Sequence, residues 1–314
     1  MAQDLFEFSD LDKFARIAEL GSFVRAATEL GISQPALSKS IAKLERKVGV
    51  KLLERRARGV VPSAYGEVLL KSLLPALADL NSAMQDIDSM KGGKGGVVSI
   101  GASPSVAGYF LPKVVERILR SKRQISLSVT EGLVEELLEK VMSGKFDFAI
   151  TTKTLTEQPD ELIFQNLFRD TFVVCCGAAH PLARRKEVTA RELCDRPWVL
   201  APRRGVQRRE FEKSFRKQGV NPPSAVIETS SGSLSKSLVI EQGFLSLLPR
   251  ELIAYEQSKG DIVEVRVAWL AWDRQISLVR RRGKVLSGAE NFVIGLLGSA
   301  AKSLPRAQGR AVTA

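Results

Sequence analysis

The chain has 314 residues, of which 44% are hydrophobic and 26% charged, a composition typical of globular proteins with room for two or three domains. No stretch approaches the roughly 20 consecutive apolar residues of a membrane-spanning helix. The acidic start MAQDLFEF lacks the pattern of a secretory signal, so we expect a cytoplasmic protein without membrane contact. Lys and Arg (47) outnumber Asp and Glu (35), and the net charge of +12 favours a polyanionic partner.

The segment from residue 11 to residue 66 has the pattern of three helices followed by a hairpin. Apolar residues recur at helical spacing in three stretches, and each lies between a capping serine and a glycine that can adopt a left-handed conformation. The predicted caps are Ser9, Ser22 and Ser33, and the predicted ends are Gly21, Gly31 and Gly49. Because the turn between the second and third helices is short, the segment predicts a helix-turn-helix.

The third of these helices has an apolar face and a cationic face. The opposite side from its apolar stripe combines small residues with cations, which suits a helix that lies in the major groove of DNA. The expected base contacts are Gln34, Pro35, Ser38 and Lys39, beside the cap Ser33, and the expected phosphate contact is Lys43. The alternative is an ordinary solvated helix face.

A basic hairpin follows the third helix. Apolar pairs on both sides of Gly59 predict two short strands, and the cations around the turn are Arg55, Arg56 and Arg58. A purely structural turn does not need three arginines. We therefore interpret the hairpin as a wing whose cations contact DNA phosphates.

The stretch AATELGISQPALSKSIAKLERKVGVKLLER, followed by PSAYGEVLL, resembles the winged helix-turn-helix of LysR-type transcriptional regulators. The SQPALS core and the G-V-x-L-L-x-R exit into the wing carry the resemblance, which continues through the C-terminal part and covers nearly the whole chain. It implies an effector-responsive regulator that binds double-stranded DNA as a homodimer or homotetramer, and it favours the tetramer.

Two positions depart from the family pattern. Members often carry Arg where Lys39 stands, and Leu-Thr where Val61-Pro62 leads into Ser63. Lysine is a point donor and lacks the planar fork of arginine, so the first departure is expected to weaken bidentate contact with guanine. Neither departure affects the expected fold.

Residues 64–90 have the pattern of one long helix. Its apolar stripe is spaced four, four, three, four and three residues apart, at Leu69, Leu73, Leu77, Leu80, Met84 and Ile87. This spacing is typical of a coiled-coil seam, so we expect the helix to dimerise. The alternative is that the stripe packs on its own chain.

Four glycines within residues 91–96 predict a flexible hinge. The expected organisation is a DNA-binding domain at 1–65, a linker and dimerisation helix at 66–90, the hinge at 91–96, an effector-binding domain at 97–302 and a flexible tail at 303–314.

After the hinge, strand patterns such as VVSIGA, ISLSVT and FDFAITT alternate with helix patterns, which predicts an α/β fold with parallel strands and crossover helices. A second set of alternating elements begins at TFVVCCG, and ISLVRRR returns the chain to the first set. The two lobes resemble the periplasmic-binding-protein-like (type 2) effector domain of LysR-type proteins. Lobe I is expected at about 97–168 and 269–302, and lobe II at about 169–268.

Hydroxyl-rich loops follow several of the predicted strands. Open α/β sheets bind ligands at the carboxyl ends of strands, where helix N-termini favour an oxyanion. The expected effector-binding residues are Ser103, Pro104, Ser105, Thr151, Thr152, Arg203, Arg204, Thr229, Ser230 and Ser231. The alternative for any one loop is ordinary helix capping. The family resemblance implies a small effector here, often anionic or aromatic.

The sequence contains no pattern of a catalytic or metal site. It lacks a Gly-rich phosphate loop and a G-x-S-x-G elbow, and its single histidine is His180. We expect no catalytic residue, no metal and no cofactor besides the effector. The alternatives are an enzyme on a two-lobed scaffold and an architectural DNA protein. The odd set Cys175, Cys176 and Cys194 argues against disulfides and favours inert packing over redox sensing.

Overall fold

The structure is a computed structural model that describes residues 7–57, 59–90, 96–153, 159–203, 205–304 and 310–311. The chain divides into two compact units, Met1–Gly92 with Met142–Lys145, and Gly93–Val141 with Phe146–Ala314. Four features expected from the sequence lie outside the described residues: Arg58 of the wing, Arg204 of the effector site, residues 91–95 of the hinge, and most of the tail after residue 304.

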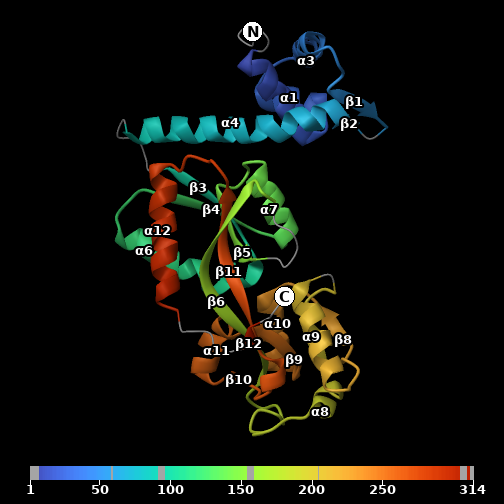
Figure 1. Ribbon diagram of the computed structural model, residues 1–314, viewed down its shortest axis with the longest axis vertical. Helices are drawn as coiled ribbons and strands as arrows, with labels where there is room; N and C mark the ends of the chain where they lie inside the picture. Colours follow the sequence, from blue (N-terminus) through green and yellow to red (C-terminus); the bar gives the residue numbers. More distant parts are fainter. Residues whose placement is uncertain are drawn as a thin grey trace. The chain divides into compact units, whose positions relative to one another are not determined.

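The N-terminal unit consists of three short helices, a two-stranded hairpin and one long helix (Figure 1). The helices are α1 (Phe8–Leu20), α2 (Phe23–Leu30), α3 (Gln34–Val48) and α4 (Ala64–Met90), and the strands are β1 (Leu53–Arg56) and β2 (Gly59–Pro62). The sequence therefore predicted the helix-turn-helix, the hairpin and the long helix in the right order.

Local capping chemistry fixes the ends of the short helices. Gly21, Gly31 and Gly49 end them with φ of 64°, 66° and 84°, which confirms the predicted left-handed ends. The hydroxyls of Ser22 and Ser33 accept hydrogen bonds from backbone N–H groups in the first turn of each helix, as predicted. The prediction for Ser9 was wrong, because α1 already begins at Phe8 and Glu7 occupies the cap position.

The core of this unit lies between α1, α2, α3 and the first half of α4. Phe14, Ile17, Leu37 and Leu44 are at most 1% exposed, so the apolar stripe of α3 faces inward. Part of the α4 stripe packs on the same core, namely Leu69, Leu73 and Leu77. The first half of α4 thus belongs to the core of the N-terminal unit.

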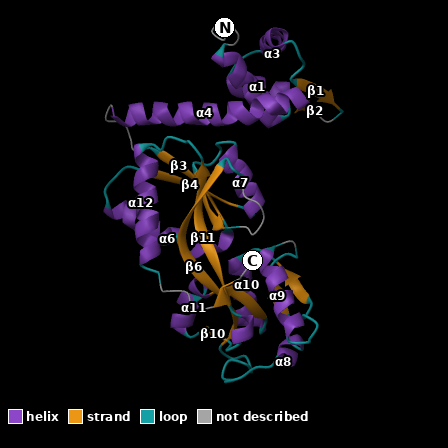
Figure 2. Cartoon of the chain, in the orientation of Figure 1, coloured by secondary structure: helices purple, strands orange, loops and turns teal. Residues whose placement is uncertain are grey.

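The second unit is built around a mixed sheet with helices on both sides (Figure 2). Eight of the described strands follow the order β4-β3-β5-β11-β6-β9-β7-β8, while β10 pairs with β6 and β12 with β11. The strands are β3 (Val97–Ala102), β4 (Ser126–Glu131), β5 (Phe148–Thr152), β6 (Leu162–Gly177), β7 (Trp198–Leu200), β8 (Ala225–Glu228), β9 (Leu245–Pro249), β10 (Ile262–Glu264), β11 (Trp272–Arg281) and β12 (Arg310–Ala311).

The helices connect parallel neighbours, as the alternating pattern predicted. β3 pairs in parallel with β4 and β5, and β7 with β8 and β9. The helices are α5 (Pro104–Tyr109), α6 (Leu111–Arg120), α7 (Val134–Met142), α8 (Ala190–Cys194), α9 (Val206–Lys217), α10 (Gly232–Gln242), α11 (Ala254–Lys259) and α12 (Gly288–Lys302), with 3-10 turns η1 (Arg250–Leu252) and η2 (Ala268–Leu270).

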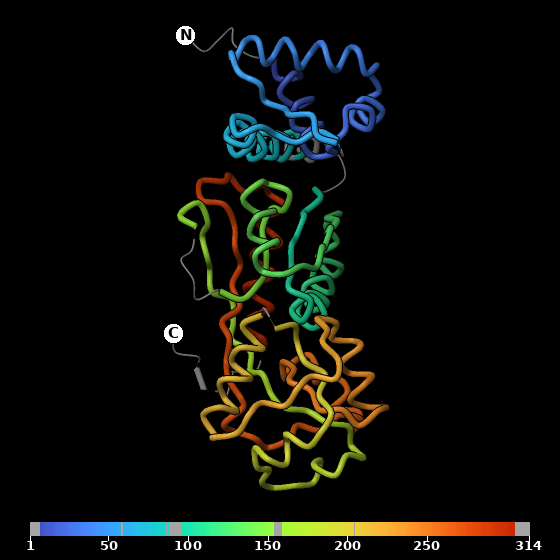
Figure 3. The backbone as a smooth tube through the Cα atoms, turned by 90° about the vertical axis from the view of Figure 1, so that its right-hand side faces the viewer, coloured from blue at the N-terminus to red at the C-terminus, as the bar shows by residue number. Residues whose placement is uncertain are grey.

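Two separate cores define two lobes within the second unit. One contains Phe168 of β6 and Ile276 of β11, and the other contains Phe172 and Trp272 of the same two strands. β6 and β11 are antiparallel partners along their whole common length and run side by side through both lobes (Figures 1 and 3). These two strands are therefore the structural connection on which the lobes depend.

Candidate functional site

The outward face of α3 places the predicted base contacts together on the surface of the N-terminal unit. Gln34, Pro35, Lys39, Ala42 and Arg46 are exposed, and Ser38 is half-buried. Small side chains alternate with cations on this face, while the opposite stripe is buried. The small side chains allow the helix to approach a base-pair edge closely, and the longer cationic side chains can reach guanine edges or phosphates.

Lys43, the predicted phosphate contact on α3, is engaged by α1. Its ammonium group donates a hydrogen bond to Glu7, 36 residues away in sequence, and lies 3.7 Å from Oδ2 of Asp10. The Glu7 carboxylate raises the pKa of Lys43, because it favours the charged form. Asp10 is 4% exposed and also accepts a hydrogen bond from Ser40 of α3. In this structure Lys43 therefore braces α3 against α1.

Glu45 ties the hairpin to the end of α3. Its side chain is buried, and one carboxylate oxygen accepts hydrogen bonds from the backbone N–H groups of Leu52 (2.9 Å) and Leu53 (3.3 Å). The other oxygen accepts one from Nζ of Lys51 at 2.6 Å. Glu45 was not predicted from the sequence, although an acidic side chain next to the apolar stripe indicates a buried partner.

The hairpin presents two described arginines to solvent. Arg55 lies opposite Val60 and Arg56 opposite Gly59 in the antiparallel register. The Arg56 guanidinium donates to Glu54 at 3.1 Å, and both arginines are exposed. Gly59 has φ of 132°, and a Cβ at this position would lie 2.5 Å from the Gly21 carbonyl oxygen. Only glycine allows the wing to pack this closely on the corner between α1 and α2.

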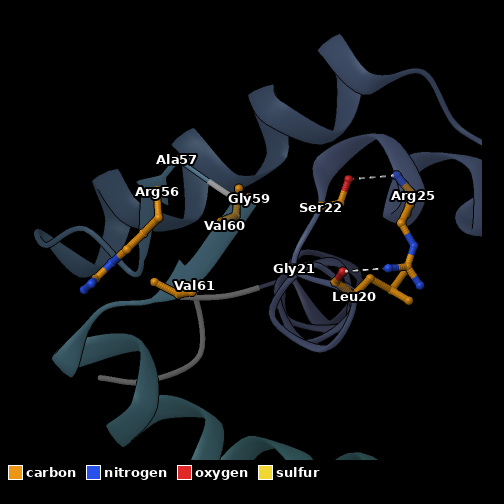
Figure 4. Close-up of a pocket in the computed structure, with 9 residues that line it drawn as sticks. All are labelled: Leu20, Gly21, Ser22, Arg25, Arg56, Ala57, Gly59, Val60 and Val61. Atoms are coloured by element: carbon orange, nitrogen blue, oxygen red, sulfur yellow. Dashed lines mark hydrogen bonds between the residues drawn. The ribbon is translucent and has the colours of Figure 1, made fainter.

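An open hollow of about 790 Å³ lies between the wing and this corner (Figure 4). It is lined by Leu20, Gly21, Ser22, Arg25, Arg56, Ala57, Gly59, Val60 and Val61. Arg25 and Arg56 lie at opposite sides of the hollow in Figure 4. The positive end of α2 points into the same region, so the hollow suits a phosphate. Arg25 was not among the DNA contacts predicted from the sequence.

In lobe I, the loops after β3 and β5 lie side by side, because the Ser103 N–H donates to the Ile150 carbonyl at 3.2 Å. The hydroxyls of Ser103 and Thr151 are buried and have no hydrogen-bond partner among the described residues. Pro104 begins α5, and Thr152 is half-buried at the end of β5. A buried polar group without a partner costs about 1–3 kcal/mol, so these two hydroxyls need a reason to be there.

In lobe II, the predicted effector residues already have partners. Thr229 accepts a hydrogen bond from the Ser231 N–H at 3.0 Å, and Ser231 caps α10 by accepting one from Leu234 N at 3.2 Å. Ser231 therefore caps α10, and Ser230 in the same loop is exposed. Arg203 pairs with Glu228 at 3.2 Å, so its charge is compensated.

A helix of lobe I and a helix of lobe II approach one another around Leu252 of η1. A Cβ on Gly108 of α5 would lie 3.2 Å from this side chain, and one on Gly232 of α10 would lie 3.0 Å from it. Glycine at both positions thus lets the first helix of lobe I and a helix of lobe II come close to the same leucine.

Arg274 of β11 connects both lobes and was not predicted as a site residue. Its guanidinium donates to Asp170 at 2.7 and 2.9 Å and to Ser105 at 2.8 Å, and it lies 4.6 Å from the ring centre of Phe172. Burial lowers the pKa of Arg274, but the Asp170 carboxylate more than offsets this and the net shift is upward. The Tyr109 hydroxyl also donates to Asp170, and burial raises the pKa of Tyr109.

The predicted dimer seam of α4 divides into two halves. Leu69, Leu73 and Leu77 pack on the core of their own unit. Leu80, Met84 and Ile87 are 44%, 51% and 44% exposed. The second half of the stripe therefore remains available to another helix.

The described residues contain no group of three or more His, Cys, Asp or Glu side chains placed to hold a metal ion. Within the same described ranges, none of the helices has the length and apolarity that crossing a bilayer requires. Cys175 and Cys176 are buried, and Cys194 is half-buried.

Two family models match the chain. The model of the bacterial regulatory helix-turn-helix protein, lysR family, matches residues 8–67, and the LysR substrate binding domain matches residues 91–302. The chain belongs to the LysR family. It is a DNA-binding transcriptional regulator with an effector-binding domain and not an enzyme, which confirms the family and fold class identified from the sequence.

The chain is also similar to individual known members of the LysR family. The HTH-type transcriptional regulator GbpR of Azospirillum brasilense is 33% identical over 245 residues, 77% of this chain and 71% of that protein. A full-length OxyR variant of Pseudomonas aeruginosa has a TM-score of 0.70 at 21% identity, covering 98% of this chain and 99% of that one. ArgP of Mycobacterium tuberculosis has a TM-score of 0.70 at 22% identity, covering 95% and 98%. The two solved structures share the fold.

Proposed function

We propose that this LysR-family regulator reads double-stranded DNA with the outward face of α3 and holds the flanking backbone with the wing. The supporting observation is that the exposed face of α3 and the exposed wing arginines are fixed to one another through the buried Glu45. The proposed base contacts are Gln34, Pro35, Ser38 and Lys39, with Ser33 at the helix start. Such a helix and wing place base readers and phosphate contacts in one rigid element.

The proposed phosphate contacts are Arg55, Arg56, Arg58 and Lys43, and we propose Arg25 and Arg46 in addition. Arg25 and Arg56 flank the hollow of Figure 4, and Arg46 is exposed on the same face of α3 as Lys39. Lys43 differs from the others because Glu7 and Asp10 already compensate its charge. A phosphate can bind Lys43 only in competition with these carboxylates.

We propose that a small organic effector binds between the two lobes, which divide near residues 168 and 269. The proposed contacts are Ser103, Pro104, Ser105, Thr151, Thr152, Arg203, Arg204, Thr229, Ser230 and Ser231. Support comes from the two unpartnered hydroxyls of lobe I and from the approach of both lobes around Leu252. Effector binding would then change the lobe angle, and so the placement of subunits on DNA.

We propose a cytoplasmic homodimer or homotetramer joined through the second half of α4. Leu80, Met84 and Ile87 form an exposed apolar stripe at the spacing of a coiled-coil seam. Two α3 helices held by such a dimer can read two half-sites about one helical turn apart.

The test of the proposed function is footprinting of the full-length protein on the DNA directly upstream of its own gene. We expect one protected region with two half-sites, and protection that changes when the matching organic acid is added from a panel of aromatic and aliphatic acids. Uniform coating of unrelated DNA, with no preferred site and no response to any acid, would show an architectural protein instead.

A further inference from the structure

Three rows of side chains follow one another on one face of the lobe I sheet. The antiparallel register aligns β5, β11 and β6, so each row takes one residue from each strand. The first row is Ala149, Val279 and Phe164, the second is Thr151, Ser277 and Asn166, and the third is Lys153, Gln275 and Arg169. The first row therefore consists of apolar side chains, the second of hydroxyl and amide side chains, and the third of two cationic side chains with an amide between them.

The register places all three rows on the same face. Side chains two residues apart on a strand point to the same side, and the irregularity between Ile276 and Ser277 keeps Asn166 and Arg169 on one side despite their odd spacing. The intervening residues Ile150, Ile276 and Phe168 lie in the lobe I core on the other face. We call the second and third rows together the polar rows.

The second row contains a hydroxyl without a partner. Thr151 is 0% exposed, and its Oγ1 makes no hydrogen bond with a described residue. Its neighbour Ser277 is also 0% exposed and donates to Oδ1 of Asn166 at 3.2 Å. A valine at position 151 would fill the same volume without the cost of an unsatisfied hydroxyl, so the threonine favours a polar ligand at this place.

The third row contains two cations without a carboxylate partner. Lys153 and Arg169 are exposed and form no ion pair with a described residue, whereas Arg203 and Arg274 are both compensated. One strand separates the two cations, so their backbones lie about 10 Å apart and both long side chains can reach a small ion between them. The amide of Gln275 between them is directed to the backbone carbonyls of Phe168 (2.8 Å) and Ile276 (2.9 Å).

We propose that the polar rows bind the oxyanion group, a carboxylate or phosphate, of the small effector. Lys153 and Arg169 supply the charge, and Asn166 and Thr151 supply hydrogen-bond donors. The inference rests on the proposed effector function and extends its site from Thr151 along the two strands that join the lobes. Because β6 and β11 carry four of the six residues of the polar rows, namely Asn166, Arg169, Gln275 and Ser277, an anion bound here acts directly on the connection between the lobes.

The test is thermal unfolding of the full-length protein, followed by tryptophan fluorescence, in the presence of succinate or inorganic phosphate. Each anion is compared with sodium chloride at equal ionic strength, because general screening also shifts the transition. We expect at least one anion to raise the midpoint above the chloride control. Arg169→Gln and Lys153→Gln should each weaken the apparent affinity about tenfold, the effect of losing one charge-assisted hydrogen bond. Lys186→Ala, an exposed lysine in lobe II, is the matched control and should behave like the parent.

Thr151→Val separates a binding role from a structural one. We expect its midpoint without anion to be equal to or higher than that of the parent, and its anion-induced shift to be reduced. No shift with succinate or phosphate, a full shift in Arg169→Gln or Thr151→Val, or an equal loss in Lys186→Ala would overturn the inference. Footprinting is independent of these measurements. A protein that binds anions but no specific DNA site contradicts the proposed function, and one that binds its site but neither anion contradicts only this inference.

Discussion

Asp170 on β6 and Arg274 on β11 face each other in register where both strands pass from one core to the other, and they form a two-point ion pair with N–O distances of 2.7 and 2.9 Å. The side chain of Asp170 is 1% exposed and that of Arg274 is 13% exposed. Through Ser105, the pair also holds the start of α5, which belongs to the proposed effector site. This buried ion pair therefore links β6 and β11, the strands that connect the lobes, to the start of α5 in the proposed effector site.

We expect Asp170→Asn to lower the free energy of unfolding of the effector domain by about 3–5 kcal/mol, because it leaves the Arg274 charge buried without its partner. Urea unfolding followed by tryptophan fluorescence measures this change, since Trp198, Trp269 and Trp272 all lie in the effector domain. Glu116→Gln breaks an exposed pair with Arg120 and should cost less than about 1 kcal/mol. Equal costs for the two variants would contradict the role assigned to Asp170.

The brace between Lys43 and Glu7 predicts a gain of DNA affinity. We expect Glu7→Gln to strengthen binding about two- to fivefold and to steepen its salt dependence, because a phosphate then competes only with Asp10 for Lys43. Titrating operator DNA at several salt concentrations measures both. Lys43→Ala should weaken binding evenly across sequences and flatten the salt slope by about one unit, and Glu7→Gln should then have no further effect. A gain from Glu7→Gln that persists without Lys43 would refute the competition.

Arg25 offers a second test of the DNA interface. We expect Arg25→Ala to weaken binding to all DNA sequences alike, because a phosphate contact carries no sequence information. Lys39→Gln should instead reduce the preference for the operator by about 1–3 kcal/mol. Competition between operator and unrelated DNA distinguishes the two. A change of sequence preference in Arg25→Ala would place it at a base edge and not at the hollow.

Local chemistry explains which features were predictable from the sequence. The helix ends at Gly21 and Gly49 follow from the conformational freedom of glycine, which depends on few neighbours, and these predictions were confirmed. The Lys43 partner Glu7 is distant in sequence, and no local pattern indicates which carboxylate a lysine will meet. The face of α3 was thus predictable, but the pairing state of its cations was not.

The lobe connection was harder to predict for the same reason. Residues 162–170 were not assigned to a strand from the sequence, yet they form the first half of β6 because they pair with β11 more than a hundred residues away. The pair Asp170 and Arg274 exists only once this register is set. A site formed across such strands, including the polar rows, can be recognised only from the folded sheet.

The exposed half of α4 predicts where the oligomer can be broken. We expect Leu80→Glu to dissociate the oligomer while leaving the fold intact, because Leu80 is 44% exposed within its own chain. Leu73→Ala should instead destabilise the N-terminal unit by about 2–5 kcal/mol, because Leu73 lies in its core. Light scattering after size exclusion measures the mass, and the control is Gln85→Glu, an exposed residue on a different face of α4. An unchanged mass for Leu80→Glu would exclude this seam.

Glu290 at the start of α12 makes the stability of the effector domain depend on pH. It is 2% exposed, and its carboxylate accepts hydrogen bonds from Lys284 (2.8 Å) and the Ser287 N–H (3.2 Å). Lys284 also binds Asp147 at 2.6 Å, so one cation serves two carboxylates. Burial raises the pKa of Glu290 from its ordinary 4.5 to about 7, and the nearby Asp147 acts in the same direction.

The folded state binds the Glu290 proton more tightly than the unfolded chain does. The contribution of protonated Glu290 to the free energy of unfolding is therefore fully present below pH 4.5 and is lost as pH rises through about 7. For one proton, the free energy of unfolding should fall by at most about 1.4 kcal/mol per pH unit over this range. Urea unfolding from pH 5 to pH 8 measures the slope. Glu290→Gln should flatten it, while Glu135→Gln, an exposed carboxylate on α7, should leave it unchanged. If the free energy of unfolding of Glu290→Gln still falls with pH, another group takes up the proton. Asp147 would then be the next residue to substitute, because it shares Lys284 with Glu290.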